Sequence, residues 1–480
     1  MLTRLQVDGF KNLRLVDLRF GPLTCFAGPN GVGKSNLFDA IAFLSDLASM
    51  PLIKAATQVR GTGGRLVGIN QLFGRYAQSE RRIRLVAEMI VPLTVLDDFD
   101  RKAVATATCL RYSISLLLNG AQDDADDGQT LCVETEELTA LSLDAATESL
   151  RFKPSKAWRA RYLKGPGPRT SPFISMVAGD AIKLWGDKGG KGRPFTVPAR
   201  KTPQTLLSGV NTSTHPTALA VRREMQSWRL LQLEPSALRA PDEFKSDKFL
   251  SSTGGHLPNA LRRIGCQAEL ANQLSELVPG VISIDVDSDD ARQQRTLVVT
   301  MRDRQPYQAS SLSDGTLRFI ALGLLGLDSQ ANGLVCLEEP ENGIHPQRIA
   351  EMMSLVKRLS EDQDGADVEF ESAPVLAPRQ VIINTHSPLV VGQLPDSDLL
   401  MAETLRQQGR EWVAFKPLAD TWRAEGLALT DLVSKGELQA YLGGTPGELQ
   451  LDPVITLNTA GKSVRGRTVK DHLNYDLFFG

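Results

Sequence analysis

Residues 28–35 constrain the fold of this chain more than any other segment, because their sequence is Gly-Pro-Asn-Gly-Val-Gly-Lys-Ser. This octapeptide fits the pattern G-x-x-x-x-G-K-[ST] without a mismatch. The apolar run Leu23–Ala27 before it is typical of a buried strand, and apolar residues recur at helical spacing over residues 36–50 after it. Strand, glycine-rich loop and helix together form a loop that holds phosphate with backbone N–H groups and a helix N-terminus. The chain is therefore predicted to bind a nucleoside triphosphate.

Within this loop, Lys34 is expected to reach the β- and γ-phosphates, and the hydroxyl of Ser35 is expected to ligate Mg²⁺. The alternative, a chance match in a glycine-rich turn, is disfavoured because both flanks are correct. The residues of this segment that are predicted to contact the nucleotide are Asn30, Gly31, Gly33, Lys34, Ser35 and Asn36.

The composition sets few limits on function. The 480 residues suffice for two or three domains, and a net charge of −2 neither requires nor excludes nucleic acid. The five cysteines form no C-x-x-C pair, which favours buried free thiols in a reducing compartment. The charged N-terminus does not resemble a signal peptide, and the longest apolar run, residues 319–327, is too short to cross a bilayer. We expect a cytoplasmic protein with no membrane association.

Periodicity predicts alternating strands and helices. Strands are expected at residues 2–7, 13–20, 83–91, 110–118, 282–286, 295–301, 334–337, 380–384, 398–401 and 411–416, and helices at 218–231, 259–278 and 346–360. The acidic runs 123–128 and 362–372 predict loops. The absence of heptads argues against a long coiled-coil arm.

Three further segments carry groups that suit nucleotide chemistry. The apolar strand 334–337 ends in Glu338 and Glu339, and such a pair can hold Mg²⁺ through its water shell and act as a base for water. Ser313-Asp314-Gly315 opens an apolar helix as an N-cap and anion seat, and His386 follows the strand 380–384. Each segment alone also fits a purely structural explanation: a charged turn, a helix cap, or a structural histidine.

In this order, the segments resemble the ABC-type ATPases of the SMC and RecF class, and in detail the bacterial ATPases related to the overcoming-lysogenization-defect (OLD) proteins. The matching segments are Phe10-Lys11-Asn12 for the N-terminal motif, residues 28–35 for Walker A, 312–316 for the signature motif, 338–346 for Walker B with the D-loop, and 384–388 for the switch histidine.

The resemblance implies an α/β fold, a P-loop NTPase of ABC/SMC-head type. A central, mostly parallel sheet with helices would be joined by an antiparallel β lobe and an inserted middle region. It also implies a homodimer, or a higher homo-oligomer of head-to-tail pairs, that clasps ATP between Walker A of one copy and Ser313 and Gly315 of the other. Glu339 would be the general base, His386 would contact the γ-phosphate, and Ser35 and Glu338 would hold Mg²⁺.

The chain departs from the class at two points. Most members have Asp where this chain has Glu338, whose longer side chain can still reach the water shell of the metal. The glutamine loop of the class has no clear match, and Gln226 and Gln232 are both candidates.

Four regions are expected from these motifs. They are an N-terminal ATPase lobe with Walker A (1–95), an inserted β-rich and basic region (96–220), a C-terminal ATPase lobe with the signature, Walker B and switch histidine (221–420), and a tail (421–480).

Many relatives carry a Toprim nuclease behind the ATPase. Here the nearest approach to its Asp-x-Asp motif is Asp396-Ser397-Asp398, which follows Pro395 in a predicted turn with no strand-borne glutamate before it. The resemblance therefore implies a stand-alone ATPase, like the sensor half of two-gene phage-defence systems whose nuclease or other toxin acts in trans. A RecF-like ATPase of DNA repair or chromosome maintenance is the alternative, while the Phe10-Lys11 start disfavours a transporter subunit.

The window Arg151–Lys201 holds 13 Lys and Arg residues against two acidic residues, with aromatic residues between them. A dense basic cluster attracts phosphates and aromatic rings can stack on bases, so this window is the best candidate surface for DNA. A solvated insertion, or one that binds a protein partner, explains the same composition.

Overall fold

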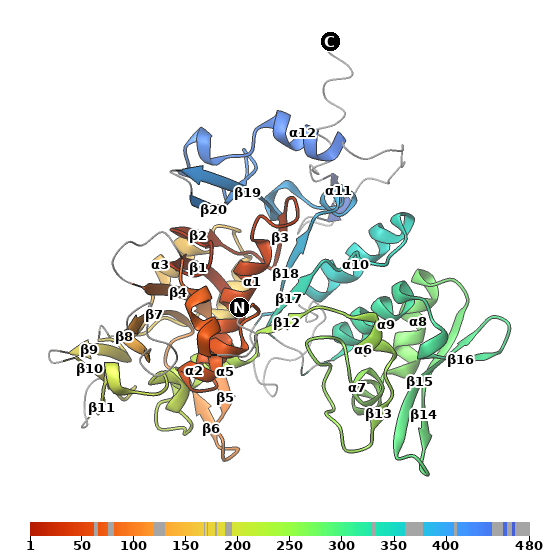
Figure 1. Cartoon of the computed structure of the whole chain (residues 1–480), viewed down its shortest axis with the longest axis horizontal. Coiled ribbons are helices and arrows are strands. Elements are labelled where there is room, and N and C mark those ends of the chain that lie inside the picture. The colour runs from red at the N-terminus through yellow and green to blue at the C-terminus, as the bar shows by residue number, and fades with distance from the viewer. Residues whose placement is uncertain are drawn as a thin grey trace.

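The fold is described from a computed structural model of the 480-residue chain (Figure 1). The structure describes all residues except 62–65, 75–80, 120–129, 168, 170, 178–179, 188–193, 329, 331–332, 361–377, 408–409, 444–454, 458–462 and 466–480. The predicted acidic loops 123–128 and 362–372, and most of the predicted tail, lie outside the described residues.

A six-stranded sheet forms the centre of the molecule. Its order is β12-β17-β18-β3-β19-β20, and only the edge strand β20 runs antiparallel to its neighbour. The strands are β12 (Arg229–Leu231), β17 (Leu334–Glu338), β18 (Gln380–Thr385), β3 (Leu23–Ala27), β19 (Leu399–Gln407) and β20 (Arg410–Pro417). Every residue of β3, β17 and β18 is buried, which explains why these strands are apolar runs rather than alternating ones.

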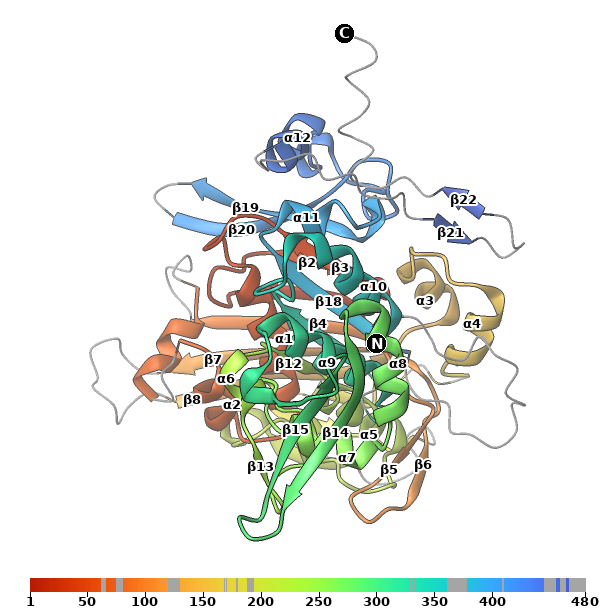
Figure 2. The ribbon, with the colours of Figure 1, turned by 90° about the vertical axis from the view of Figure 1, so that its right-hand side faces the viewer.

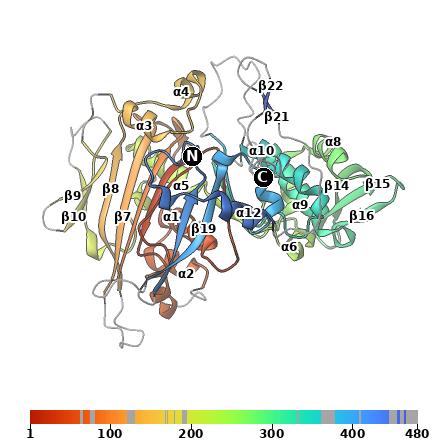
Figure 3. The ribbon, with the colours of Figure 1, turned by 90° about the horizontal axis from the view of Figure 1, so that it is seen from above.

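An antiparallel sheet of eight strands lies to one side of the central sheet, in the order β11-β10-β9-β8-β7-β4-β1-β2 (Figure 3). Its strands are β1 (Leu2–Asp8), β2 (Val16–Arg19), β4 (Arg82–Ile90), β7 (Cys109–Asn119), β8 (Thr130–Ala140), β9 (Ile174–Val177), β10 (Ala181–Leu184) and β11 (Phe195–Pro198). This sheet joins the N-terminal strands to strands from the basic window.

The two faces of the central sheet belong to two hydrophobic cores. Cys336 and Ile382 pack with α1 (Lys34–Leu47), α2 (Leu52–Gln58), α5 (Pro216–Gln226) and the antiparallel sheet. Leu337 and Ile383, one residue further along each strand, pack with the helices of the opposite side. Those helices are α7 (Leu257–Ile264), α8 (Gln267–Leu277), α9 (Asp314–Leu327) and α10 (Ile349–Ser360).

A smaller lobe carries α6 (Pro235–Arg239), α7, α8, α9 and a sheet of β13 (Asp242–Glu243), β14 (Val281–Asp289), β15 (Gln294–Met301) and β16 (Pro306–Gln308), and Figure 2 looks onto it. Two helices, one in this lobe and one just before it in the chain, are shorter in the structure than the sequence predicts. The helix predicted to reach residue 231 ends at Gln226, and residues 229–231 form β12. The helix predicted over 259–278 is broken at Gly265, whose φ of +70° ends α7.

The remaining elements are short. They are β5 (Thr94–Leu96), β6 (Lys102–Val104), α3 (Leu143–Ser149), α4 (Lys156–Tyr162), α11 (Pro388–Val391), α12 (Lys435–Gly443), β21 (Ile455–Leu457) and β22 (Ser463–Arg465). In the part of the chain that the structure describes, the longest helices are the 14-residue α1 and α9, so no coiled-coil arm occurs there. No helix among these residues is both long and apolar enough to cross a membrane. Cys25 and Cys336 are buried free thiols, as predicted.

Candidate nucleotide site

Three of the predicted motifs, those that follow β3, β17 and β18, meet at one edge of the central sheet, because parallel strands bring their carboxyl ends to the same edge. Strand β3 leads into the phosphate-binding loop, and β17 and β18 lie next to it in the order β17-β18-β3. Glu338 pairs in register with Asn384, and Thr385 pairs with Ala27. Segments about 300 residues apart in the chain are thereby placed side by side.

The phosphate-binding loop closes around its own lysine. Lys34 donates through Nζ to the backbone oxygens of Gly28 at 2.6 Å and Pro29 at 2.8 Å. Burial lowers the pKa of this ammonium group. Asn30, Gly31 and Ser35 are exposed at the mouth of the loop, where a phosphate could approach backbone N–H groups.

Residues of the N-terminal motif contact the phosphate-binding loop and helix α1. Asn12 donates to the backbone oxygen of Val32 at 3.0 Å and accepts from Asn36 at 2.7 Å. Gly33 has a φ of +112°, and a Cβ there would lie 2.3 Å from Asn12 Nδ2, so no larger residue fits. Lys11 pairs with Asp39 of α1 at 2.7 Å.

The Walker B carboxylate already has a partner in this structure. Arg60 donates to both oxygens of Glu338, at 2.5 and 2.9 Å, and to Asp39 at 2.6 Å. It also donates to the backbone oxygen of Ser35 at 3.2 Å. Sequence reasoning missed Arg60, since no motif marks it and its partner Glu338 lies 278 residues away.

The second carboxylate, Glu339, is held by three neighbours. Its side chain accepts from Asn342 at 2.7 Å and lies 2.9 Å from Nδ1 of His386, while its backbone N–H donates to Oδ1 of Asn384 at 2.9 Å. Burial acts to raise its pKa, but hydrogen bonds from Asn342 and His386 and the charge of Lys34 lower it overall. The backbone of Glu339 is left-handed, with a φ of +41°, a costly geometry that clusters at functional sites.

Glu341 is a third carboxylate near the loop. It is buried and accepts a hydrogen bond from the hydroxyl of Thr385, and its second oxygen has no hydrogen-bond partner among the described residues. Burial raises the pKa of this group. The sequence places it inside the D-loop match, but only the fold reveals its burial.

A cavity of about 410 Å³ lies beside the two adjacent carboxylates, and neither Lys34, Glu341 nor His386 lines it. Its lining includes Ser35, Gln232, Arg318, Glu338 and Glu339. Of the two glutamine candidates, only Gln232 lines it, because β12 ends beside β17. Gln226 instead donates to the backbone of Ala48 on α1's C-terminal side.

The donor set of this cavity fits a magnesium ion. Ser35, Glu338 and Gln232, whose side chains carry oxygen atoms, line one cavity, and oxygen ligands are what Mg²⁺ prefers. Arg60 occupies both carboxylate oxygens of Glu338 here, so a bound ion would have to displace it. Within the described residues, no cluster of three or more His, Cys, Asp or Glu side chains could hold a metal by itself. A metal here would therefore depend on the phosphates as further ligands.

The signature segment lies apart from this cavity. Ser313 caps α9 by accepting from the backbone N–H of Thr316 at 3.2 Å, and it is exposed. Neither Ser313 nor Gly315 lines the cavity. Gly315 instead lies close to the D-loop of the same chain, since a Cβ added to it would be 3.2 Å from the backbone oxygen of Gly343.

Asp396 and Asp398 of the Asp-x-Asp sequence lie in a short 3₁₀ helix after Pro395. Asp398 is enclosed beside Arg423, and burial raises its pKa to about 6. This short helix contains no glutamate that could accompany the two aspartates as in a Toprim nuclease.

Parallel strands that end in a phosphate-binding loop, two adjacent carboxylates and a histidine define a P-loop ATPase of the ABC and SMC-head class. The chain belongs to the family described as "AAA domain, putative AbiEii toxin, Type IV TA system", which matches residues 23–99 and 222–392, more than half of its length.

Short stretches are also similar to curated proteins. The DNA replication and repair protein RecF of Bacteroides fragilis is 50% identical over 46 residues, which are 9% of this chain and 12% of RecF. The OLD nuclease of Thermus scotoductus is 54% identical over 41 residues, or 8% of each chain. The chain thus matches only about a tenth of the length of these relatives.

Among solved structures, the SmcHead bound to the C-winged helix domain of ScpA has a TM-score of 0.41 at 12% identity, covering 87% of this chain and 98% of that chain. The SMC head domain from Thermotoga maritima has a TM-score of 0.37 at 13% identity, with the same coverage. Both TM-scores are below 0.5, and the fold is instead defined by the strand order of the central sheet.

Proposed function

We propose that this chain binds ATP with Mg²⁺ at the sheet edge and hydrolyses it to ADP and phosphate. The observation that carries the proposal is the register that sets Glu338 beside Asn384 and Thr385 beside the phosphate-binding loop. Ser35 and Glu338 would hold the Mg²⁺, and the ion would neutralise charge on the β- and γ-phosphates. Lys34 would leave the oxygens of Gly28 and Pro29 to reach the phosphates.

Glu339 is the base of this proposed reaction. Its lowered pKa keeps it ionised at neutral pH, so it can accept a proton from water. Asn342 and His386 each contact one of its oxygens, which fixes the direction of the carboxylate. His386 is half-exposed at the mouth of the site, where it could also contact the γ-phosphate.

We propose further that the active unit is a head-to-tail homodimer, or a larger assembly of such pairs. Ser313 is exposed and does not line the cavity of its own chain, so a second copy can present it to the nucleotide. Asn30, Gly31, Gly33 and Asn36 would complete the site from the phosphate-binding loop.

Phosphate release tests the catalytic proposal. The parent should release phosphate from ATP only with Mg²⁺, and Lys34→Ala should bind no ATP, whereas Lys54→Ala, on the exposed side of α2, should match the parent. Hydrolysis that persists after chelation of Mg²⁺, or hydrolysis by the Lys34→Ala variant, would refute the proposal.

In the cell, we propose that this ATPase senses phage infection and controls a partner effector, a nuclease or other toxin encoded nearby, in the cytoplasm. The family description names a toxin and a toxin–antitoxin system, and one relative is an OLD nuclease. Plaque counts with the neighbouring genes test this role. Protection should require Lys34 and the neighbouring gene, and equal plaque counts with and without the pair would reject it.

The similarity to RecF favours a second role in DNA repair or chromosome maintenance. Sensitivity to DNA damage after deletion, without any change in phage resistance, would favour that role. Direct DNA binding would use the basic window, where Arg159 and Lys164 are accessible at α4 and just after it. Of its aromatic residues, Tyr162 and Phe173 are buried, three others are half-buried, and Phe195 is 59% exposed.

A further inference from the structure

A second cavity, of about 300 Å³, lies outside the nucleotide site and shares no lining residue with it. It is a half-open pocket lined by the paired strands β1 and β2, the turn after α3, strands β19 and β20, and the loop of residues 423–427. One part of its wall is apolar, formed by Leu18, Leu400, Phe415 and Leu427. The rest carries arginine side chains.

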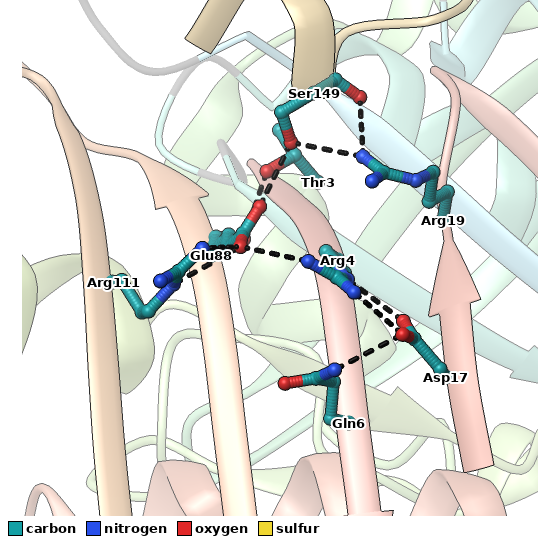
Figure 4. A network of polar contacts seen from close by, with 8 residues as sticks. All are labelled: Thr3, Arg4, Gln6, Asp17, Arg19, Glu88, Arg111 and Ser149. Atoms are coloured by element: carbon teal, nitrogen blue, oxygen red, sulfur yellow. Dashed lines mark hydrogen bonds and ion pairs between the residues drawn. The ribbon is translucent and has the colours of Figure 1, made fainter. Parts of the chain in front are cut away.

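The inner arginines of this region are matched by carboxylates (Figure 4). Arg4 donates to both oxygens of Asp17, at 2.7 and 2.5 Å, and lies 3.3 Å from Glu88. Arg111 pairs with the same Glu88 at 2.6 Å. Two guanidinium groups are thus balanced by two carboxylates.

Among the described residues, Arg19 and Arg151 are not paired with carboxylates in this way. Arg19 donates to the backbone oxygen of Ser149 at 3.0 Å and to its hydroxyl at 3.3 Å, as Figure 4 shows. Arg151 donates to the backbone oxygen of Glu425 at 2.6 Å. Within the described residues neither forms a salt bridge, although Glu425 also lines the cavity with an exposed carboxylate.

The two arginines also affect each other. Burial lowers the pKa of Arg19 and the charges of Arg4 and Arg151 lower it further, while the charges of Glu88 and Asp17 act to raise it. Arg423, the remaining arginine of the wall, lies beside the buried Asp398. Two guanidinium groups therefore lie at one side of a half-open cavity without a salt bridge to any described carboxylate, and Asp17 and Glu425 are the acidic residues of its lining.

We propose that this cavity binds a small ligand with a phosphate dianion, either a phosphate monoester with an apolar body or free phosphate. Two guanidinium groups match a dianion in charge, and their planar donors suit phosphate oxygens. The apolar wall beside Phe415 would hold the body of an ester. A concave pocket of this size suits a terminal phosphate better than duplex DNA, whose backbone phosphates lie on a broad convex surface. This site is separate from the proposed ATPase reaction.

Calorimetry on the full chain tests the proposal, with the nucleotide site first filled by a non-hydrolysable ATP analogue and Mg²⁺. The probes are inorganic phosphate, uridine 5′-monophosphate and uridine. The monophosphate or phosphate should bind and uridine should not. Tighter binding of the monophosphate would assign an ester as ligand, and equal binding would assign free phosphate.

Variants locate the binding. Arg19→Gln and Arg151→Gln should each weaken it about tenfold or more, because charged hydrogen bonds are lost. Lys153→Gln, an exposed neighbour of Arg151, should leave it unchanged, and Glu425→Gln should tighten it. Unfolding of each variant without ligand, followed by circular dichroism, checks its fold.

Several results would overturn the site. They are no binding of phosphate or monophosphate at millimolar concentration, equal binding of uridine, unchanged affinity in both arginine variants that fold, or binding of duplex DNA alone.

Discussion

Replacing Glu339 by glutamine should stall hydrolysis while leaving ATP binding intact. Glutamine can keep the neighbours of this side chain, because its amide oxygen can accept from Asn342 and its amide can still meet His386. What it loses is the charge and the ability to take a proton from water. Loss of a positioned base costs ~10²–10⁴-fold in rate, equivalent to ~3–5 kcal/mol of activation free energy.

Single-turnover phosphate release measures this loss, and equilibrium binding of a fluorescent ATP analogue measures affinity separately. Binding should be equal or tighter, because a neutral side chain no longer repels the γ-phosphate. The matched control is Glu276→Gln, an exposed position on α8. Parental turnover in Glu339→Gln, or an equal loss of ATP affinity and rate, would refute the assignment of this base.

Three further outcomes are expected. Lys34→Ala mixed with Ser313→Arg should recover part of the ATPase activity that each lacks, since a mixed dimer keeps one intact composite site; no recovery in demonstrated mixed dimers would contradict head-to-tail pairing. If DNA is a ligand, Arg159→Glu with Lys164→Glu should weaken its binding and flatten the salt dependence by about one unit per lost phosphate contact, measured by anisotropy; equal affinity across the salt series would instead favour a protein-docking surface. Burial raises the pKa of Glu136 to about 7 from 4.5, so the folded state holds its proton more strongly, and the free energy of unfolding should fall by up to ~3 kcal/mol between about pH 4.5 and 7. Denaturant unfolding of Glu136→Gln should show a correspondingly smaller fall, and an identical pH dependence would disprove this role.

The central sheet could be predicted from the sequence because its strands are short apolar runs that end in chemically distinctive residues. The strands before Gly28, Glu338 and His386 were all expected, and burial on both faces explains why their pattern was clear. The edge that they form then follows from parallel pairing.

Other features depended on tertiary contacts. The helix predicted to reach residue 231 carried apolar residues that instead serve β12, and this break moves Gln232 into the nucleotide cavity. The contact of Arg60 with Glu338 joins distant segments, so no local pattern could indicate it. The same holds for the Arg19 and Arg151 pair, whose charges are ordinary in sequence and unusual only in their surroundings.

The contact between Gly315 and Gly343 bears on how two copies would work together. In a head-to-tail pair, the signature segment proposed to serve the partner's nucleotide would lie close to the D-loop that follows the chain's own proposed base. Gly343 has a φ of +75° and a Cβ added there would lie 3.2 Å from Asp314, so we expect a shift of one segment to displace the other. ATP clasped in one site would then be felt in the second, and the influence would be equal in both directions, as linkage requires. The state of such a pair would depend on how many nucleotides it holds, so a signal to an effector could require two bound ATP molecules rather than one.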